Sequence, residues 1–315
     1  MSPVEAAKLS DAALTANGGP PRIGLIGYGE VGQTLAADFA AAGIHHVSAW
    51  DKLFADRSSA PSQAVATSRH VQPAAGMAEA LADCTVVVCA VTAGNCVAAA
   101  REAARGLPPL TLYFDLNSVA PRTKREAAAV IEMSSGRYVE AVIMSPIGPK
   151  RIASPILIGG PHAEAFAPLA RKIGFTGVTV FDASIGRASA AKMCRSVMVK
   201  GLEALFAESL LAARRHGVEQ TVIESLRDLF PNEDWERIAH YLISRSLQHG
   251  RRRAEEMQEA ARAVVETGIA PLMSVACAKR QEWAAAHRPA REAASLAELL
   301  DAVLTGTGTE QLESA

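Results

Sequence analysis

Short apolar runs rich in β-forming residues alternate with helical patterns over the first 180 residues of the chain. Strands that alternate with helices favour parallel pairing, so this pattern predicts an α/β domain with a mostly parallel sheet and helices on both faces. The segments that we assign to strands are 23–26, 47–50, 85–91, 110–114, 138–144, 156–158 and 178–181.

The pattern changes after Asp182, where the strand signal stops. Residues 183–216 are rich in alanine and free of proline, which predicts one long helix. The second half of the chain is therefore expected to be an all-α domain. Apolar residues in it recur at helical spacing in four further segments, 219–229, 235–248, 252–267 and 271–287.

This change of pattern sets the expected domain limits. We predict an α/β domain over residues 21–182 and a helical domain over residues 183–304. Asn17 to Pro21 has the composition of a linker, so residues 1–20 are expected to be a flexible tail. The small and polar residues at the other end predict a disordered tail over residues 305–315.

Composition narrows the classes of function. With 315 residues, 49% of them hydrophobic, the chain is long enough to build two ordinary cores. A net charge of -1 gives no general attraction to nucleic acid or to an anionic membrane, so the expected partners are small molecules or copies of the chain itself. The longest uncharged run, 84–100, suits a buried strand and a helix start better than a membrane span.

The five cysteines are scattered without paired spacing, so the sequence predicts neither a disulfide framework nor a zinc site. The N-terminal segment carries Glu5, Lys8 and Asp11 and lacks the apolar core of a signal peptide. The histidines show no metal-ligand spacing and no cluster of acids around them. We therefore expect a cytoplasmic protein without a metal site.

The most informative motif is a glycine-rich turn after the first predicted strand. Gly27, Gly29 and Gly32 form a GxGxxG pattern that leads into a helix predicted over residues 30–42. Gly27 permits the tight turn, Gly29 lets a pyrophosphate approach the backbone, and Gly32 lets the helix lie close to the strand. The N–H groups of the helix N-terminus supply an anion site. The motif predicts a Rossmann-type dinucleotide site, and a purely structural glycine turn is the alternative.

An acid follows the second predicted strand, which strengthens this interpretation. Asp51 lies 19 residues after Gly32, where the Rossmann pattern places the carboxylate that accepts hydrogen bonds from the adenosine ribose. A carboxylate here repels the 2′-phosphate of NADP, whereas Lys52 and Arg57 beside it attract one. We expect NAD as the cofactor, with NADP as the alternative.

A second polar turn follows the strand predicted at 110–114. It contains Asn117 and Ser118 and ends in Pro121 at a predicted helix start. Ligands collect at the carboxyl ends of parallel strands, so these two side chains are candidates to hydrogen-bond nicotinamide or a substrate oxygen. Simple capping of the following helix is an equally good interpretation.

The long predicted helix begins with a cationic face. Lys192, Arg195 and Ser196 fall within an arc of about 100°, and Lys200 lies just beyond it. Cations on an otherwise apolar helix are costly to bury without anionic partners. The pattern indicates either an anion-binding and proton-transfer face or a solvated stripe.

Together these segments resemble the beta-hydroxyacid dehydrogenases, the superfamily of 3-hydroxyisobutyrate dehydrogenase and 6-phosphogluconate dehydrogenase, over about residues 22–215. The glycine turn matches the cofactor loop of the family. Residues 115–121 match its D-x-[SN]-[ST]-x-x-P segment, and Lys192 matches the lysine of its catalytic helix. The helical half looks like the C-terminal domain of poorly characterised bacterial members.

The resemblance implies a reversible hydride transfer between nicotinamide and the hydroxyl-bearing carbon of a 3-hydroxy acid or related alcohol, with Lys192 as general acid/base. Alcohol oxidation needs a neutral lysine to take the hydroxyl proton, and burial beside a cationic ring lowers a lysine pKa toward that state. An imine reductase of the same fold is the nearest alternative. A nicotinamide-binding regulatory protein without catalysis is the alternative from a different class.

The chain departs from the family where the family anchors its substrate. The family segment D-x-P-V-S-G-G corresponds to residues 140–146, in which the paired glycines are missing and Pro146 has no N–H. The family's asparagine four residues after the lysine is replaced by Ser196. We expect the substrate to be held differently, with Arg195 or Lys200 in contact with it.

Motif and resemblance assign two sets of binding residues. The run 251–253 is left out of both sets, because a solvated helix face explains it at least as well as contact with a cofactor phosphate, the role of a later lysine in the family. The long first helix of the α domain leads us to expect a homodimer. The cofactor-binding set is Gly27, Tyr28, Gly29, Glu30, Val31, Gly32, Asp51, Lys52, Val91 and Asn117. The substrate-binding set is Ser118, Met144, Ser145, Arg195 and Ser196.

Overall fold

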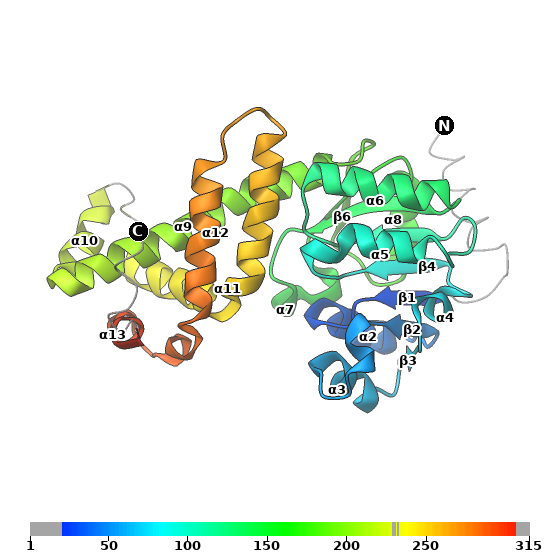
Figure 1. Cartoon of the computed structure of the whole chain (residues 1–315), viewed down its shortest axis with the longest axis horizontal. Coiled ribbons are helices and arrows are strands. Elements are labelled where there is room, and N and C mark those ends of the chain that lie inside the picture. Colours follow the sequence, from blue (N-terminus) through cyan, green and yellow to red (C-terminus); the bar gives the residue numbers. More distant parts are fainter. Residues whose placement is uncertain (1–20, 229–230, 232, 307–315) are drawn as a thin grey trace. The chain divides into compact units, whose positions relative to one another are not determined.

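The structure is a computed structural model that describes residues 21–228, 231 and 233–306. The tail predicted at residues 1–20 lies outside these residues. The tail predicted at 305–315 also lies outside them, apart from Thr305 and Gly306, which end the last helix. Figure 1 labels most of the helices and several of the strands.

The first half of the chain forms one sheet of eight strands in the order β3-β2-β1-β4-β5-β6-β7-β8. Every neighbouring pair is parallel except β6 and β7, which are antiparallel. The order 3-2-1-4-5-6 of the parallel part is that of a dinucleotide-binding fold. The strands are β1 (Ile23–Ile26), β2 (Val47–Trp50), β3 (Gln72–Pro73), β4 (Val86–Cys89), β5 (Leu112–Asp115), β6 (Arg137–Ile143), β7 (Ile156–Gly159) and β8 (Val178–Asp182).

Helices connect these strands and cover both faces of the sheet (Figure 1). One face packs against α2 and α8, and the other packs against α4, α5 and α6. The helices of this half are α2 (Glu30–Ala41), α3 (Ala60–Thr67), α4 (Met77–Leu81), α5 (Cys96–Ala103), α6 (Pro121–Met133), α7 (Ile147–Lys150) and α8 (Ala163–Lys172).

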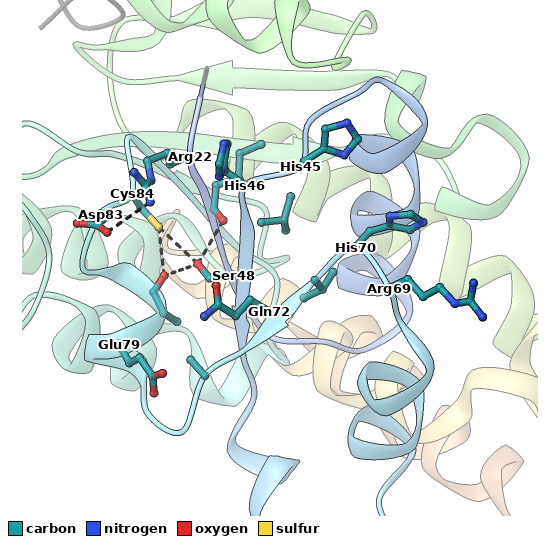
Figure 2. Close-up of a pocket in the computed structure, with 15 residues that line it drawn as sticks. Arg22, His45, His46, Ser48, Arg69, His70, Gln72, Glu79, Asp83 and Cys84 are labelled. Atoms are coloured by element: carbon teal, nitrogen blue, oxygen red, sulfur yellow. Dashed lines mark hydrogen bonds and ion pairs between the residues drawn. The ribbon is translucent and has the colours of Figure 1, made fainter. Parts of the chain in front are cut away.

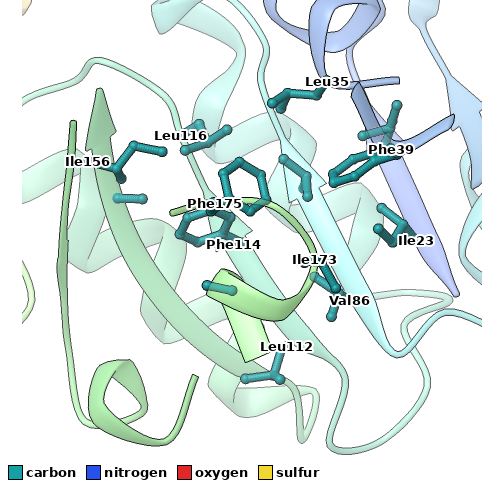
Figure 3. Packing of buried hydrophobic residues seen from close by; sticks show 14 of the residues in the cluster. Ile23, Leu35, Phe39, Val86, Leu112, Phe114, Leu116, Ile156, Ile173 and Phe175 are labelled. Carbon is teal, nitrogen blue, oxygen red and sulfur yellow. The ribbon is translucent and has the colours of Figure 1, made fainter. Parts of the chain in front are cut away.

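The period of two in a strand explains how one sheet supports two cores. In β4, Val86 and Val88 point to the cluster that contains α2 and α8, while Val87 and Cys89 point to the opposite cluster. All four side chains are buried, as expected for a parallel strand covered on both faces. In the first cluster, Phe114 and Phe175 pack edge to face near the centre (Figure 3).

Two details of the sheet differ from the prediction. The strand predicted at 110–114 begins at Leu112, because Leu110 has a φ of 64° and occupies a turn. Strand β3 was not predicted, since two residues are too few to give a periodic signal. The predicted class, a mostly parallel α/β domain of Rossmann type followed by an all-α domain, is confirmed.

The second half consists of helices around a separate apolar cluster, which includes Phe206, Leu210, Ile243 and Leu299. The two sequence patterns at 235–248 and 252–267 fall in a single helix, α11, which ends at Val265. Gly250 lies within it and lets the backbone of α12 approach closely, because a Cβ there would overlap the carbonyl of Gln281. The helices are α9 (Arg187–His216), α10 (Glu219–Ser225), α11 (Trp235–Val265), α12 (Leu272–Ala285) and α13 (Leu296–Gly306).

The chain divides into two compact units between Met193 and Cys194. The functional domain limits predicted from the sequence, 21–182 and 183–304, remain a proposal. None of the helices in the described part of the chain has the length and apolar character that a membrane crossing requires.

Candidate active site

The glycine turn joins β1 to α2 at the carboxyl edge of the sheet. Gly27 has a φ of 94°, and a Cβ there would overlap the carbonyl of Ala90 at the end of β4. A Cβ on Gly32 would overlap the carbonyl of Gly27, so this residue lets α2 lie against the turn. Around Gly29, by contrast, no atom of the described residues lies within 4 Å of the Cβ position. The turn therefore has one open face.

Asp51 follows the last residue of β2 and organises the neighbouring backbone. One carboxylate oxygen accepts the N–H of Tyr28 in the glycine turn at 2.7 Å. The other accepts the N–H of Leu53 at 2.9 Å and so caps the short 3₁₀ helix Lys52–Ala55. The acid thus ties the glycine turn to the segment after β2.

A cavity of about 270 Å³ opens beside these two segments. Its position agrees with the rule that ligands of open parallel sheets bind outside the carboxyl ends of the strands, here between β1 and β4, where the strand order reverses. Five predicted cofactor residues line the cavity: Gly27, Gly29, Asp51, Lys52 and Val91. The other residues that line it are Trp50, Leu53, Pro61, Ala90, Thr92, Asn95, Ala98, Ala99 and Glu102.

The polar residues after β4 were missed by the sequence analysis. Lys52 donates a hydrogen bond to the side-chain oxygen of Asn95 at 3.1 Å, and Asn95 donates to the hydroxyl of Thr92 at 2.6 Å. The sequence feature that could have identified Thr92 and Asn95 is their position directly after β4, a central strand of the sheet. The open glycine face, the acid and the N-terminus of α2 fit the pyrophosphate and ribose of a dinucleotide.

The remaining predicted cofactor residues lie around the cavity without lining it. Tyr28 is buried and packs its ring against Phe54 at 5.9 Å, and Val31 packs against the core. Glu30 is exposed in the first turn of α2. Their assignment to the cofactor stays a prediction.

Asn117 is buried beneath the end of β4. Its side-chain oxygen accepts the N–H of Val91 at 2.7 Å, and its amide donates to the sulfur of Cys89 at 3.3 Å. These contacts do not cap α6, whose N-cap is Ala120, so the capping interpretation does not describe Asn117. The side chain fixes the backbone beside the cavity, and its contact with a ligand stays a prediction. Ser118, next to it, is half-buried.

Lys192 lies in the first turns of α9. Its Nζ donates to the carbonyl oxygen of Ile143, the last residue of β6, at 2.6 Å. Strands β1, β4, β5 and β6 run parallel, so Lys192 and the glycine turn lie at the same edge of the sheet. Met144 and Ser145, two predicted substrate residues, directly follow Ile143 and are half-buried.

Arg195 and Ser196 belong to the helical unit. Arg195 is exposed, whereas Ser196 is buried and accepts a hydrogen bond from Lys200 at 3.1 Å. Lys200 also pairs with Glu256 at 2.8 Å. Burial lowers the pKa of Lys200, and the Glu256 carboxylate opposes this shift.

The arginine run at 251–253 is not uniformly solvated. Arg252 is partly exposed and pairs with Glu256 at 2.6 Å. Arg253 is buried and pairs with Glu203 on α9. A solvated helix face therefore describes Arg252 but not Arg253.

A larger cavity, of about 480 Å³, lies at the opposite edge, where β1 and β2 begin (Figure 2). Its lining includes His45, His46 and His70, and it lacks a glycine turn. The hydroxyl of Ser48 donates to the carbonyl of Ala80 at 2.6 Å, and burial raises the pKa of Cys84 to about 11, so neither group is prepared as a nucleophile. Within the described residues, no group of three or more His, Cys, Asp or Glu side chains is placed to hold a metal ion.

Two glycine variants test the cofactor site. Gly29→Ala is expected to fold as stably as the wild type, because Gly29 has a φ of -77° and open space around it, yet to bind NADH about tenfold or more weakly. Gly27→Ala is expected to lose ~1–2 kcal/mol or more of stability, because its backbone is left-handed. Thermal unfolding and fluorescence titration with NADH measure both effects. If Gly29→Ala kept the NADH affinity of the wild type, the pyrophosphate would not lie against the backbone of this residue.

Comparison with known proteins assigns both halves of the chain. Residues 22–170 match the family described as the NAD binding domain of 6-phosphogluconate dehydrogenase. Residues 213–284 match a domain of unknown function, DUF1932.

Solved structures resemble the chain over most of its length. A conserved hypothetical protein from Sinorhizobium meliloti is 30% identical, with 93% of this chain and 99% of that one covered and a TM-score of 0.69. A conserved protein of unknown function, described as structurally similar to 3-hydroxyacid dehydrogenases, is 33% identical, with 91% and 100% covered and a TM-score of 0.65.

A 3-hydroxyisobutyrate dehydrogenase from Mycobacterium tuberculosis shares the fold at 18% identity, with 92% of this chain and 100% of that one covered and a TM-score of 0.67. The matches to the first two structures extend over nearly the full length of this chain and so span both of its matched segments. The chain belongs to the beta-hydroxyacid dehydrogenase superfamily, in the branch that joins an NAD-binding domain of the 6-phosphogluconate dehydrogenase type to a DUF1932 domain.

Proposed function

We propose that the protein is an NAD(P)-dependent oxidoreductase that transfers a hydride between nicotinamide and the hydroxyl-bearing carbon of a 3-hydroxy acid or related alcohol. Lys192 is its general acid/base. The observation that carries the proposal is the hydrogen bond of 2.6 Å from Lys192 to Ile143, which holds the amine at the sheet edge that also carries the glycine turn.

The chemistry of the amine fits this role. A neutral lysine has two N–H groups and one lone pair. An N–H donated to the carbonyl of Ile143 orients the amine. In the neutral form the lone pair accepts the proton of a substrate hydroxyl. In the opposite direction the ammonium returns that proton. The bound nicotinamide would supply the hydride chemistry, held by Gly27, Gly29 and Asp51.

We propose NAD as the preferred cofactor. Asp51 lies at the cavity beside the glycine turn, where a carboxylate accepts hydrogen bonds from a ribose hydroxyl and repels a 2′-phosphate. Lys52 is the opposing influence, but its ammonium is directed to Asn95. The assignment of Ser118, Met144, Ser145, Arg195 and Ser196 to the substrate remains part of the proposal.

A panel of substrates tests the function. Purified protein is mixed with NAD or NADP and with short, phosphorylated and aromatic 3-hydroxy acids, and nicotinamide absorbance is followed. We expect turnover with at least one 3-hydroxy acid and a higher kcat/KM with NAD than with NADP. Reduction of a cyclic imine in place of alcohol oxidation would favour an imine reductase. Cofactor binding without turnover across the panel would favour the regulatory interpretation.

We also propose a homodimer. Met198, Leu202 and Leu205 lie on one face of α9 and are 66%, 43% and 55% exposed, so they form an apolar stripe on the helical unit. A second copy of this chain would cover it. Sedimentation equilibrium checks this, since a mass of 33.1 kDa, that of one chain, would contradict it.

A cytoplasmic location is part of the same proposal. All five cysteines are free, and four of them are buried. Unpaired thiols are typical of proteins that work in a reducing compartment. Fractionation of the native cells, with immunodetection of the protein, is the direct test of location.

A further inference from the structure

Glu140 lies on β6 with its carboxylate at the N-terminus of α9, and it is completely buried. One carboxylate oxygen accepts the N–H of Gly186 at 2.7 Å, and the other accepts the N–H of Ser189 at 2.7 Å. The first N–H groups of a helix have no partners within the helix, and the helix dipole favours an anion there. A single side chain of the sheet therefore satisfies two of these donors and fastens the start of α9 to β6.

The same strand and the same helix make a second contact one turn further on. Ile143 is three residues after Glu140, and Lys192 is three residues after Ser189. Three strand residues advance roughly 10 Å, and three helical residues advance about 4.5 Å. The long lysine side chain spans the difference and reaches the carbonyl of Ile143. The position of Nζ at the sheet edge thus depends on where the first turn of α9 is fixed along β6.

Ser189 also connects the start of α9 to a third segment through a hydrogen bond. Its hydroxyl donates to the carbonyl of Val119 in the polar turn after β5. Burial raises the pKa of Glu140, and the Lys124 ammonium and the two backbone N–H groups oppose this rise. Because Glu140 is fully buried, it has no surface with which to contact a substrate.

We propose that Glu140 is a positioning residue that sets the register of α9 on β6 and thereby holds the Lys192 amine at the carboxyl edge of the sheet. The role of that amine in proton transfer rests on the function proposed above. The position of the amine does not, and it can be measured separately.

The test measures the reactivity of Lys192 in the full-length protein. Lysines are labelled with trinitrobenzenesulfonate over a series of pH values, and the rate at Lys192 is read by mass spectrometry relative to the exposed Lys172. In Glu140→Gln one of the two N–H groups faces an amide donor instead of an acceptor. We expect labelling of Lys192 to change by about tenfold, because one charge-assisted hydrogen bond is lost, and hydrogen exchange in residues 186–192 to become faster.

Two further variants keep the result interpretable. Glu140→Asp retains the buried charge but is too short to reach both N–H groups, so it is expected to show the same change if Glu140→Gln does not fold. Glu132→Gln is the matched control, because Glu132 accepts the N–H of Tyr138 at 2.9 Å near the start of β6. It should leave the reactivity of Lys192 unchanged.

The proposal would be overturned if a folded Glu140 variant had the same Lys192 reactivity and the same hydrogen exchange as the wild type. NADH affinity should stay unchanged in all three variants, because the glycine turn is carried by β1. If reactivity changes as expected while no substrate of the panel is turned over, the positioning role stands and the proposed function fails. If the wild type turns over a substrate while the variants keep the reactivity of Lys192 unchanged, the proposed function stands and the positioning role fails.

Discussion

Replacing Lys192 with methionine is expected to lower turnover by about 10²–10⁴-fold, because the proposed acid/base group is removed from the reacting hydroxyl. The affinity for NADH should change little, since the glycine turn and Asp51 lie on other strands. Steady-state kinetics with the best substrate of the panel and fluorescence titration with NADH measure the two quantities.

Lys192→Arg separates proton transfer from charge and hydrogen bonding. A guanidinium can still donate to the carbonyl of Ile143, but it does not give up its proton at working pH. We therefore expect Lys192→Arg to be nearly as slow as Lys192→Met. Lys172→Met, an exposed change in the last turn of α8, is the control and should retain full turnover. Substantial turnover in Lys192→Arg would remove the lysine from the acid/base role.

Replacing Lys124 with methionine is expected to have the largest effect on stability. Lys124 is completely buried, and its Nζ lies 3.1 Å from a carboxylate oxygen of Asp115 and donates to the carbonyls of Asp115 and Ala141 at 2.8 and 3.2 Å. The variant would leave the buried carboxylate without its cation, a loss of ~3–5 kcal/mol. Thermal unfolding should show a midpoint lower by roughly 6–20 °C.

An exposed ion pair on the same helix provides the control. Arg122 pairs with Glu126 at 3.0 Å on the surface of α6, and Arg122→Met should cost no more than ~0.5 kcal/mol. Combining Lys124→Met with Asp115→Asn should recover part of the loss, because the uncompensated charge is gone. A loss in Lys124→Met as small as that in Arg122→Met would show that Asp115 does not need the ammonium.

The sheet could be predicted because most of its strands are short, continuous apolar runs between helical patterns. The direction of each strand was harder to predict. The apolar run that forms β7 resembles the runs of the other strands, although β7 pairs antiparallel with β6. Apolar content reports burial on both faces of a strand and carries no information about its direction. The antiparallel pair results from the short connection through α7, which returns the chain without a full crossover.

In the candidate site, too, some residues could be predicted from the sequence and others could not. Gly27, Gly29 and Asp51 could be placed together from the sequence, because each follows a predicted strand and the carboxyl ends of parallel strands share one edge. The buried group formed by Asp115, Lys124 and Tyr138 was not predicted. Its members come from three separate segments, and the sequence alone gives a lysine no sign of burial. The roles assigned to Lys192 and to the binding residues stay predictions until they are measured.

The contacts of Asp51 have a consequence for anyone who wishes to redesign the cofactor preference. The usual strategy replaces the acid after β2 with a neutral residue so that a 2′-phosphate is accepted. Here the same carboxylate also accepts the N–H groups of Tyr28 and Leu53, so its removal would loosen the glycine turn together with the segment that follows β2. A redesign toward NADP is therefore better started with Asp51 left in place and with Lys52 and Arg57 kept as the cations that attract the phosphate.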